Sequence, residues 1–257
     1  MIYVCEYENM ADILISQERL SALLLSLGAD KKIRDEMMSY VYKEDEPDDK
    51  DGICKRQAER QMQRIVARAL LDYALKKEFG VSFAELGWAE QKGGKPYSSV
   101  HPEIKFNISH CACACACAVG MTDIGIDIEK KFAYRNSLAK RICADAEWAV
   151  LRDMDEEERT RQLQYLWSLK ESFVKWNGRG ISYGMDRVSF AEALPAALAY
   201  TKDQKIRRTI LVKDIPKLLL YDGGAYTLCA CAEVFDFTVN LIDTGELCDG
   251  KTDKTEI

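Results

Sequence analysis

Hydrophobic and acidic positions alternate along Gly125–Glu129, a segment with the sequence Gly-Ile-Asp-Ile-Glu. Because a strand places successive side chains on opposite faces, Ile126 and Ile128 point to one face, and Asp127 and Glu129 to the other. Two like charges on one strand face repel each other, so this pattern predicts a strand whose acidic face meets a cation or solvent. An exposed edge strand would show the same alternation.

A second pattern, over Trp167–Lys175, has the spacing of a helix. Glu171 and Lys175 lie four positions apart and therefore share one helix face. Such a pair also supports any exposed helix, in which case Trp167 and Phe173 would simply belong to the core. Three carboxylates on two rigid elements, with a lysine beside them, suit a divalent ion that prefers oxygen ligands and holds phosphates.

Periodicity elsewhere predicts helices alternating with mainly antiparallel strands, which indicates an α+β fold. Helices are expected over residues 16–27, 54–78, 137–141, 144–152 and 157–175. Strands are expected over residues 2–7, 86–90, 104–108, 111–122, 124–129, 187–190, 206–212, 217–221 and 225–235.

Cysteine alternates with alanine from Cys111 to Cys117. A zinc site is one interpretation, but same-face residues of a strand lie roughly 6.5 to 7 Å apart. Zinc binds each thiolate sulfur at about 2.3 Å, so its ligands must come much closer together. The pattern instead favours a buried strand in which cysteine acts as a small hydrophobic residue.

A similar small-residue strand recurs over residues 226–232, which indicates an internal duplication. We therefore predict a pseudo-dimer of two similar α+β halves, each with a mainly antiparallel sheet and a long helix. The N-terminal half would span residues 1–123, the C-terminal half residues 124–242, and a polar tail residues 243–257.

Composition limits the classes of function. The chain of 257 residues has a formal net charge of −6, which argues against nucleic-acid binding as its main role but leaves room for a local basic pocket. The first residues lack a basic stretch followed by an apolar core, and no apolar run is long enough to span a bilayer. We therefore expect a cytoplasmic protein whose ten cysteines stay reduced.

Two further motifs could bind an anion. Gly94-Lys95-Pro96 predicts a cationic turn, and Phe106–His110 ends a predicted strand at a corner. Backbone amides and the Ser109 hydroxyl can bind an anion at such a corner. A single histidine there could equally be a structural hydrogen-bonding residue.

In this order, the motifs at Gly94–Pro96, Phe106–His110, Gly125–Glu129 and Trp167–Lys175 resemble those of the Sfp-type 4′-phosphopantetheinyl transferases. The resemblance implies that coenzyme A and a magnesium ion lie in a cleft between the two halves. It implies transfer of the phosphopantetheine arm of coenzyme A to a serine of an apo acyl, peptidyl or polyketide carrier protein, with release of adenosine 3′,5′-bisphosphate. The carrier and its pathway are not determined by the sequence.

The same resemblance implies roles for particular residues. It assigns magnesium coordination to Asp127, Glu129 and Glu171. It places Lys170 and Lys175 with the coenzyme A phosphates, Ser109 and His110 at the 3′-phosphate, and Lys95 near the nucleotide.

A basic residue of the helix over 54–78 should also contact the 3′-phosphate, together with Ser109 and His110, and Arg64 is our candidate. Arg60 and Arg68 on the same helix are alternatives, and Lys50, Lys55 and Arg56 are further basic residues near its start.

The resemblance also implies that the helix of Glu147 lies beside the metal, so we expect either Glu147 or Glu171 to be the general base that accepts the serine proton. Two other functions remain open: another metal-dependent phosphoryl transferase or nuclease, and a binding module that has lost catalysis. Since carrier proteins are usually acidic, a basic or apolar docking patch is expected, and the internal duplication predicts a monomer.

Overall fold

The computed structural model describes residues 1–7, 17–28, 31, 34–35, 38, 53–180, 184–194, 206–234, 238–249 and 255–256. Within these residues the chain forms two main sheets, each with one long helix. No described helix is both long enough and apolar enough to cross a membrane.

The first sheet has the strand order β11-β10-β1-β5-β4. Its strands are β1 (Ile2–Glu6), β4 (Lys105–His110), β5 (Ala114–Gly120), β10 (Val239–Ile242) and β11 (Thr255–Glu256). The accompanying helices are α2 (Gln17–Ser26), α4 (Ile53–Phe79) and α9 (Thr244–Asp249). A short 3₁₀ turn, η1 (Phe83–Glu85), leads into a two-stranded hairpin of β2 (Trp88–Glu90) and β3 (Pro96–Ser98).

The second sheet is antiparallel and has the order β6-β9-β8-β7. Its strands are β6 (Ile124–Lys130), β7 (Ile206–Ile210), β8 (Lys217–Asp222) and β9 (Tyr226–Ala232). Its helices are α5 (Asn136–Ile142), α6 (Asp145–Arg152) and α7 (Glu156–Asn177), with a 3₁₀ turn η3 (Met185–Arg187). This content confirms the α+β class predicted from the sequence.

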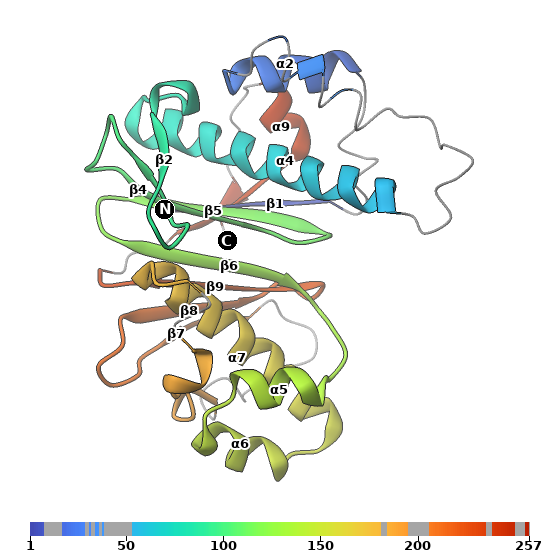
Figure 1. The fold of residues 1–257 in the computed structure, drawn as a ribbon, viewed down its shortest axis with the longest axis vertical. Coiled ribbons are helices and arrows are strands. Elements are labelled where there is room, and N and C mark those ends of the chain that lie inside the picture. The colour runs from blue at the N-terminus through green and yellow to red at the C-terminus, as the bar shows by residue number, and fades with distance from the viewer. Residues whose placement is uncertain are drawn as a thin grey trace.

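Figure 1 shows four layers: α4, the first sheet, the second sheet and α7. The Cys-Ala alternation explains how the two sheets pack against each other and against the long helices. On β5, Cys115 and Cys117 pack in the core under α4, while the alternate alanines pack in the core between the sheets. On β9, Cys229 and Cys231 pack under α7, and its alanines again face the other sheet. Small alanine side chains let the two sheets approach closely, and the described cysteines act as small apolar residues, as expected.

Three details differ from the sequence prediction. The strand expected over 187–190 is wrong, since η3 occupies 185–187. Residues 239–242, which we placed in the second half, form β10 and pair in parallel with β1 of the first sheet. In the predicted polar tail, α9 contacts α2 and α4, and β11 pairs with β10. Burial of Val239 and Ile242 against the first sheet explains this return of the chain.

Candidate functional site

The edge strands β4 and β6 of the two sheets lie close to each other, and side chains of β4 connect them. Asn107 Oδ1 accepts a hydrogen bond from the Ile126 amide (2.9 Å), and Ser109 Oγ accepts one from the Ile128 amide (3.2 Å). Asn107 and Ser109 lie two positions apart and so share one strand face. Asn107 had no predicted role, although its position two residues before Ser109 in the same motif indicates that both side chains lie on one face.

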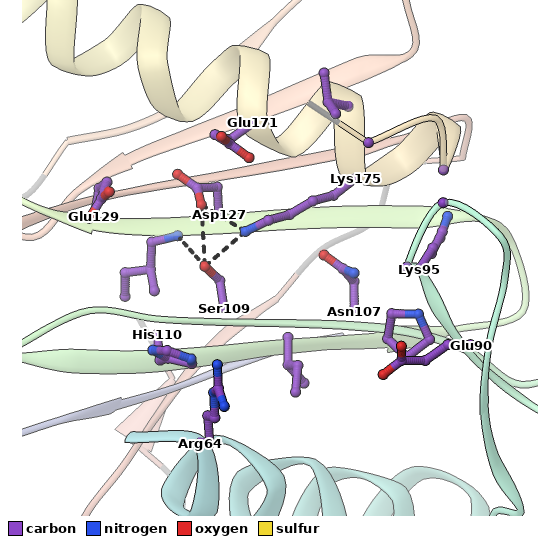
Figure 2. Close-up of a pocket in the computed structure, with 18 of the residues that line it drawn as sticks. Arg64, Glu90, Lys95, Asn107, Ser109, His110, Asp127, Glu129, Glu171 and Lys175 are labelled. Atoms are coloured by element: carbon purple, nitrogen blue, oxygen red, sulfur yellow. Dashed lines mark hydrogen bonds and ion pairs between the residues drawn. The ribbon is translucent and has the colours of Figure 1, made fainter. Parts of the chain in front are cut away.

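A cleft of about 700 Å³ opens beside this junction, between the two halves. Its walls come from α4, the β2–β3 hairpin, β4, β6 and α7. All four sequence motifs contribute lining residues, so the structure brings together segments that are far apart in the chain (Figure 2).

Gly125 allows α7 to lie directly against β6. A Cβ atom at this position would lie 2.0 Å from the Ser172 carbonyl oxygen and 2.4 Å from the Trp176 backbone nitrogen. No other residue fits without moving the helix, because these contacts are with backbone atoms. The close approach brings Glu171 and Lys175 of α7 next to Asp127.

Three polar side chains form the centre of the cleft (Figure 2). Lys175 Nζ lies 2.8 Å from Asp127 Oδ1 and donates to Ser109 Oγ at 3.0 Å. Ser109 Oγ in turn donates to Asp127 Oδ1 at 3.2 Å. The second oxygen, Asp127 Oδ2, is buried and has no hydrogen-bond partner among the described residues. A buried carboxylate oxygen without a partner is costly and is suited to an added ligand.

The other two acids of the predicted metal set lie close to Asp127. Burial, together with the charges of Asp127 and Glu129, raises the pKa of Glu171 to about 7 against the opposing effect of Lys175. Burial and Asp127 also raise the pKa of Glu129, whose Oε1 accepts a hydrogen bond from Trp167 Nε1 (3.2 Å). These shifts show that the three carboxylates interact. Among the described residues, however, no three His, Cys, Asp or Glu side chains converge as a ready-made ligand set.

Cationic residues of α4 line the opposite wall. Arg64 and Arg68 both face the cleft, and the Arg68 guanidinium lies 5.5 Å from the centre of the Trp88 ring. Arg60 is not among the described lining residues. Two of the three candidate arginines, Arg64 and Arg68, therefore line the cleft, and their contact with the 3′-phosphate stays a prediction. Lys50 lies outside the described residues, and the same holds for the side chains of Lys55 and Arg56.

His110 lies beside this cationic wall. Its Nδ1 is 3.2 Å from Gln63 Oε1. Burial lowers the pKa of His110, and the charges of Lys175 and Arg64 lower it further. An anion bound here would offset the positive charges of Lys175 and Arg64, and it would favour a protonated His110 that donates a hydrogen bond to it.

Lys95 lines the cleft, but its ammonium group is used by the protein. It donates to the Trp176 carbonyl oxygen at the end of α7 (2.7 Å) and lies 3.2 Å from Asp123 Oδ1. A cation at a helix C-terminus stabilises the unpaired carbonyls there. The Gly-Lys-Pro turn therefore fastens the first half to α7. The predicted place of Lys95 near the nucleotide stays a prediction.

The structure corrects the prediction that Lys170 and Glu147 belong to the site. Neither lines the cleft; both are fully buried, with Lys170 Nζ 2.7 Å from Glu147 Oε2. The remaining polar atoms of the pair bind backbone: Lys170 Nζ donates to the carbonyls of Ile142, Met185 and Val188, and Glu147 accepts from the amides of Ala144 and Phe190. Successive helix residues point about 100° apart. Since Glu171 faces the cleft, Lys170 faces the interior.

Comparisons with known proteins indicate one family. The family model described as the 4′-phosphopantetheinyl transferase superfamily matches residues 123–229, which include β6 and α7.

Individual relatives extend the match beyond that segment. The chain is 34% identical over 155 residues to a 4′-phosphopantetheinyl transferase of Bacillus subtilis, an alignment covering 60% of this chain and 68% of the relative. It is 31% identical over 125 residues to 4′-phosphopantetheinyl transferase Sfp of Bacillus subtilis strain 168, covering 49% and 56% of the two chains. It is also 28% identical over 160 residues to the L-aminoadipate-semialdehyde dehydrogenase-phosphopantetheinyl transferase of Mus musculus, covering 56% and 52%.

Proposed function

Because this chain belongs to the Sfp-type 4′-phosphopantetheinyl transferase family, we propose that it moves the phosphopantetheine arm of coenzyme A to a serine of an apo acyl, peptidyl or polyketide carrier protein. The second product would be adenosine 3′,5′-bisphosphate. The observation that carries this proposal is the cleft between the halves, in which three interacting carboxylates face a wall of cations.

The carboxylate end suits a magnesium ion. Asp127, Glu129 and Glu171 supply only oxygen donors, which magnesium prefers, and Asp127 Oδ2 is buried without a partner among the described residues. When bound, magnesium would neutralise the diphosphate and favour attack at phosphorus. Asp127, Glu129 and Glu171 are the residues that would hold the ion.

The cationic wall suits the phosphates of coenzyme A. Arg64 and His110 lie together on the α4 side and are the proposed 3′-phosphate contacts. Lys175 contacts Asp127 and Ser109 in the centre of the cleft, and is the proposed contact of the diphosphate. Arginine pairs well with phosphate because its donors match two phosphate oxygens at once.

The proposed reaction is a displacement at the phosphorus that carries pantetheine. The carrier serine Oγ forms a new bond to this phosphorus. The bond between this phosphorus and the bridging oxygen breaks, and the bridging oxygen leaves as part of adenosine 3′,5′-bisphosphate. The serine proton needs an acceptor. Of our two candidates only Glu171 lines the cleft, so Glu171 is the proposed base.

Further expectations accompany this proposal. The repeat of one sheet plus one long helix supports a pseudo-dimer, and a cleft built within one chain supports a monomer. The cytoplasm, where coenzyme A and carrier proteins meet, is the proposed place of action.

The direct test is incubation with coenzyme A, magnesium and an apo carrier protein, followed by intact-mass measurement of the carrier. We expect a gain of one phosphopantetheine arm that depends on magnesium and is lost when the carrier serine is replaced by alanine. Binding of coenzyme A without any mass gain, across acyl, peptidyl and polyketide carriers, would instead indicate an inert binding module.

A further inference from the structure

Two cysteines lie close together in the turn that joins β4 to β5. Cys111 Sγ and Cys113 Sγ are 3.7 Å apart, and both residues are free thiols. On a regular strand the side chains of residues two positions apart stand roughly 6.5 to 7 Å apart, and the turn brings these two closer. Besides filling space as small apolar groups, the two thiols are therefore near enough to react with each other.

The two thiols differ in their access to solvent. Cys111 is buried in the core between the sheets, and burial raises its pKa to about 12. Cys113 is half-buried, with its Sγ 4.0 Å from the Ala225 carbonyl oxygen in the turn between β8 and β9. A dissolved reagent therefore reaches Cys113 first. An accessible thiol with a second thiol beside it is the arrangement of redox-sensitive cysteines.

Hydrogen bonds hold the backbone of this turn. The Cys111 amide donates to the Ala114 carbonyl oxygen at 2.8 Å. Tyr7 binds both cysteines, since its hydroxyl donates to the Cys111 carbonyl oxygen (2.8 Å) and its amide to the Cys113 carbonyl oxygen (2.9 Å). The two sulfurs are thus kept near each other. A disulfide that is partly exposed, as this one would be, is reduced by thiols more readily than a buried structural disulfide.

A metal ion explains this pair less well. Two thiolates bound to one zinc ion also lie close together, but a structural zinc site has about four ligands. Among the described residues no third His, Cys, Asp or Glu side chain joins Cys111 and Cys113. The pair therefore suits sulfur–sulfur chemistry better than metal binding.

We infer that Cys111 and Cys113 form a reversible dithiol–disulfide site, which a small-molecule disulfide such as glutathione disulfide oxidises. Cys113 loses its proton to water, and its sulfur attacks one sulfur of the oxidant, whose S–S bond breaks and releases one thiolate. Cys111 then loses its proton, and its sulfur displaces the second thiolate from Cys113. The protein gives up two electrons, and the two released thiolates take up the two protons.

This site adjoins a residue of the proposed coenzyme A site. Cys111 directly follows His110, which lines the cleft with its Nδ1 3.2 Å from Gln63 Oε1. Drawing Cys111 toward Cys113 shifts the peptide that carries His110 and weakens its contact with the 3′-phosphate. This consequence rests on the proposed function, whereas the disulfide itself does not.

The first experiment exposes the reduced protein to glutathione disulfide and a metal chelator, and then blocks the remaining thiols after denaturation. Tandem mass spectrometry of the tryptic peptide 106–130 should show the loss of two hydrogens, located between Cys111 and Cys113. Added dithiothreitol should restore both thiols. Cys115 in the same peptide is fully buried and should stay a thiol, which makes it the internal control.

Two variants test the order of the steps. In Cys111→Ala, Cys113 should keep one bound glutathione, because no neighbouring thiol displaces it. In Cys113→Ala, neither the disulfide nor the glutathione adduct should form, because the accessible thiol is gone.

The second experiment measures the consequence for ligand binding by calorimetry. Coenzyme A carries a thiol that would itself reduce the disulfide, so the probe is adenosine 3′,5′-bisphosphate. The oxidised protein should bind this probe about tenfold more weakly than the reduced one, as for loss of one hydrogen bond to a charged group. Adenosine 5′-monophosphate, which lacks the 3′-phosphate, should bind both forms equally. In Cys113→Ala, glutathione disulfide should change neither affinity.

Two intact thiols at Cys111 and Cys113 after prolonged oxidation would overturn the site. Equal affinity of the oxidised and reduced protein for adenosine 3′,5′-bisphosphate would overturn its link to His110. Neither result bears on the proposed function, which instead fails if the reduced, unaltered protein transfers nothing to any carrier.

Discussion

Lys175 Nζ lies 2.8 Å from Asp127 Oδ1, which joins the end of α7 to the centre of β6. This contact uses one carboxylate oxygen, and the other oxygen is buried without a partner within the described residues. Lys175 therefore offsets the negative charge of Asp127 but leaves one of its two carboxylate oxygens without a hydrogen bond. Because Asp127 Oδ2 has no partner among the described residues, we place Asp127 at the centre of the proposed metal site.

The first prediction concerns the carboxylates of this site. Asp127→Asn and Glu171→Gln keep side-chain shape but remove a negative charge, so each should lower kcat for carrier modification about a thousandfold. Circular dichroism should show an unchanged fold. Glu156→Gln, an exposed position at the start of the same helix, is the matched control and should keep full activity. Near-normal turnover by either cleft variant would remove that residue from the mechanism.

A second prediction concerns pH. Since the pKa of Glu171 is raised to about 7, this carboxyl group is protonated below that pH and then cannot bind a cation. The apparent affinity for magnesium should fall about tenfold between pH 8 and pH 6, as expected for competition by one proton. Calorimetric titration at several pH values measures this. In Glu171→Gln the same pH change should have a much smaller effect, and an equally steep dependence there would assign the titration to another group.

The third prediction separates stability from catalysis at the buried Glu147–Lys170 pair. Lys170→Met leaves a buried carboxylate and three carbonyl groups without their donor, so the free energy of unfolding should fall by about 3 to 5 kcal/mol. Glu147→Gln replaces one accepting oxygen by a donating NH2 group, so it should also lower stability, but it should lower kcat less than tenfold at a temperature where the protein is folded. Denaturant unfolding and kinetics measure the two effects. A folded Glu147→Gln protein with a thousandfold loss of kcat would restore Glu147 as the candidate base.

The fourth prediction concerns the 3′-phosphate. His110→Ala should weaken coenzyme A binding about tenfold to a hundredfold, with little effect on 3′-dephospho-coenzyme A, because a hydrogen bond to a charged group is lost only with the former. Arg64→Ala should behave in the same way. Arg60→Ala is the control on the same helix and should bind both ligands normally, since Arg60 is not among the described cleft residues. Equal losses for both ligands would place the 3′-phosphate elsewhere.

Much of this site follows from local sequence patterns. The alternation of Ile126 and Ile128 with Asp127 and Glu129 predicts which side chains leave the core, and the structure confirms it. The two Cys-Ala strands likewise predict buried positions, although not that their alanines would face each other across two sheets. A period of two residues fixes the face of a strand, but not what packs on it.

Other features depend on contacts that the sequence pattern does not encode. Lys170 and Glu171 are neighbours, and only the rotation of α7 about its axis sends one inward and the other to the cleft. Lys95 lies in the predicted turn, yet its ammonium group binds a carbonyl 81 positions away. The pairing of β10 with β1 joins opposite ends of the chain, which no local periodicity reveals.

The central claim is that one divalent ion, held by Asp127, Glu129 and Glu171, contacts the diphosphate of coenzyme A. A crystal structure with coenzyme A and manganese in place of magnesium tests it directly, because anomalous scattering locates manganese without ambiguity. Our account predicts one anomalous peak in the cleft, bonded to oxygens of these three carboxylates and of the diphosphate. A peak away from Asp127, or a diphosphate bound without any ion, would contradict it.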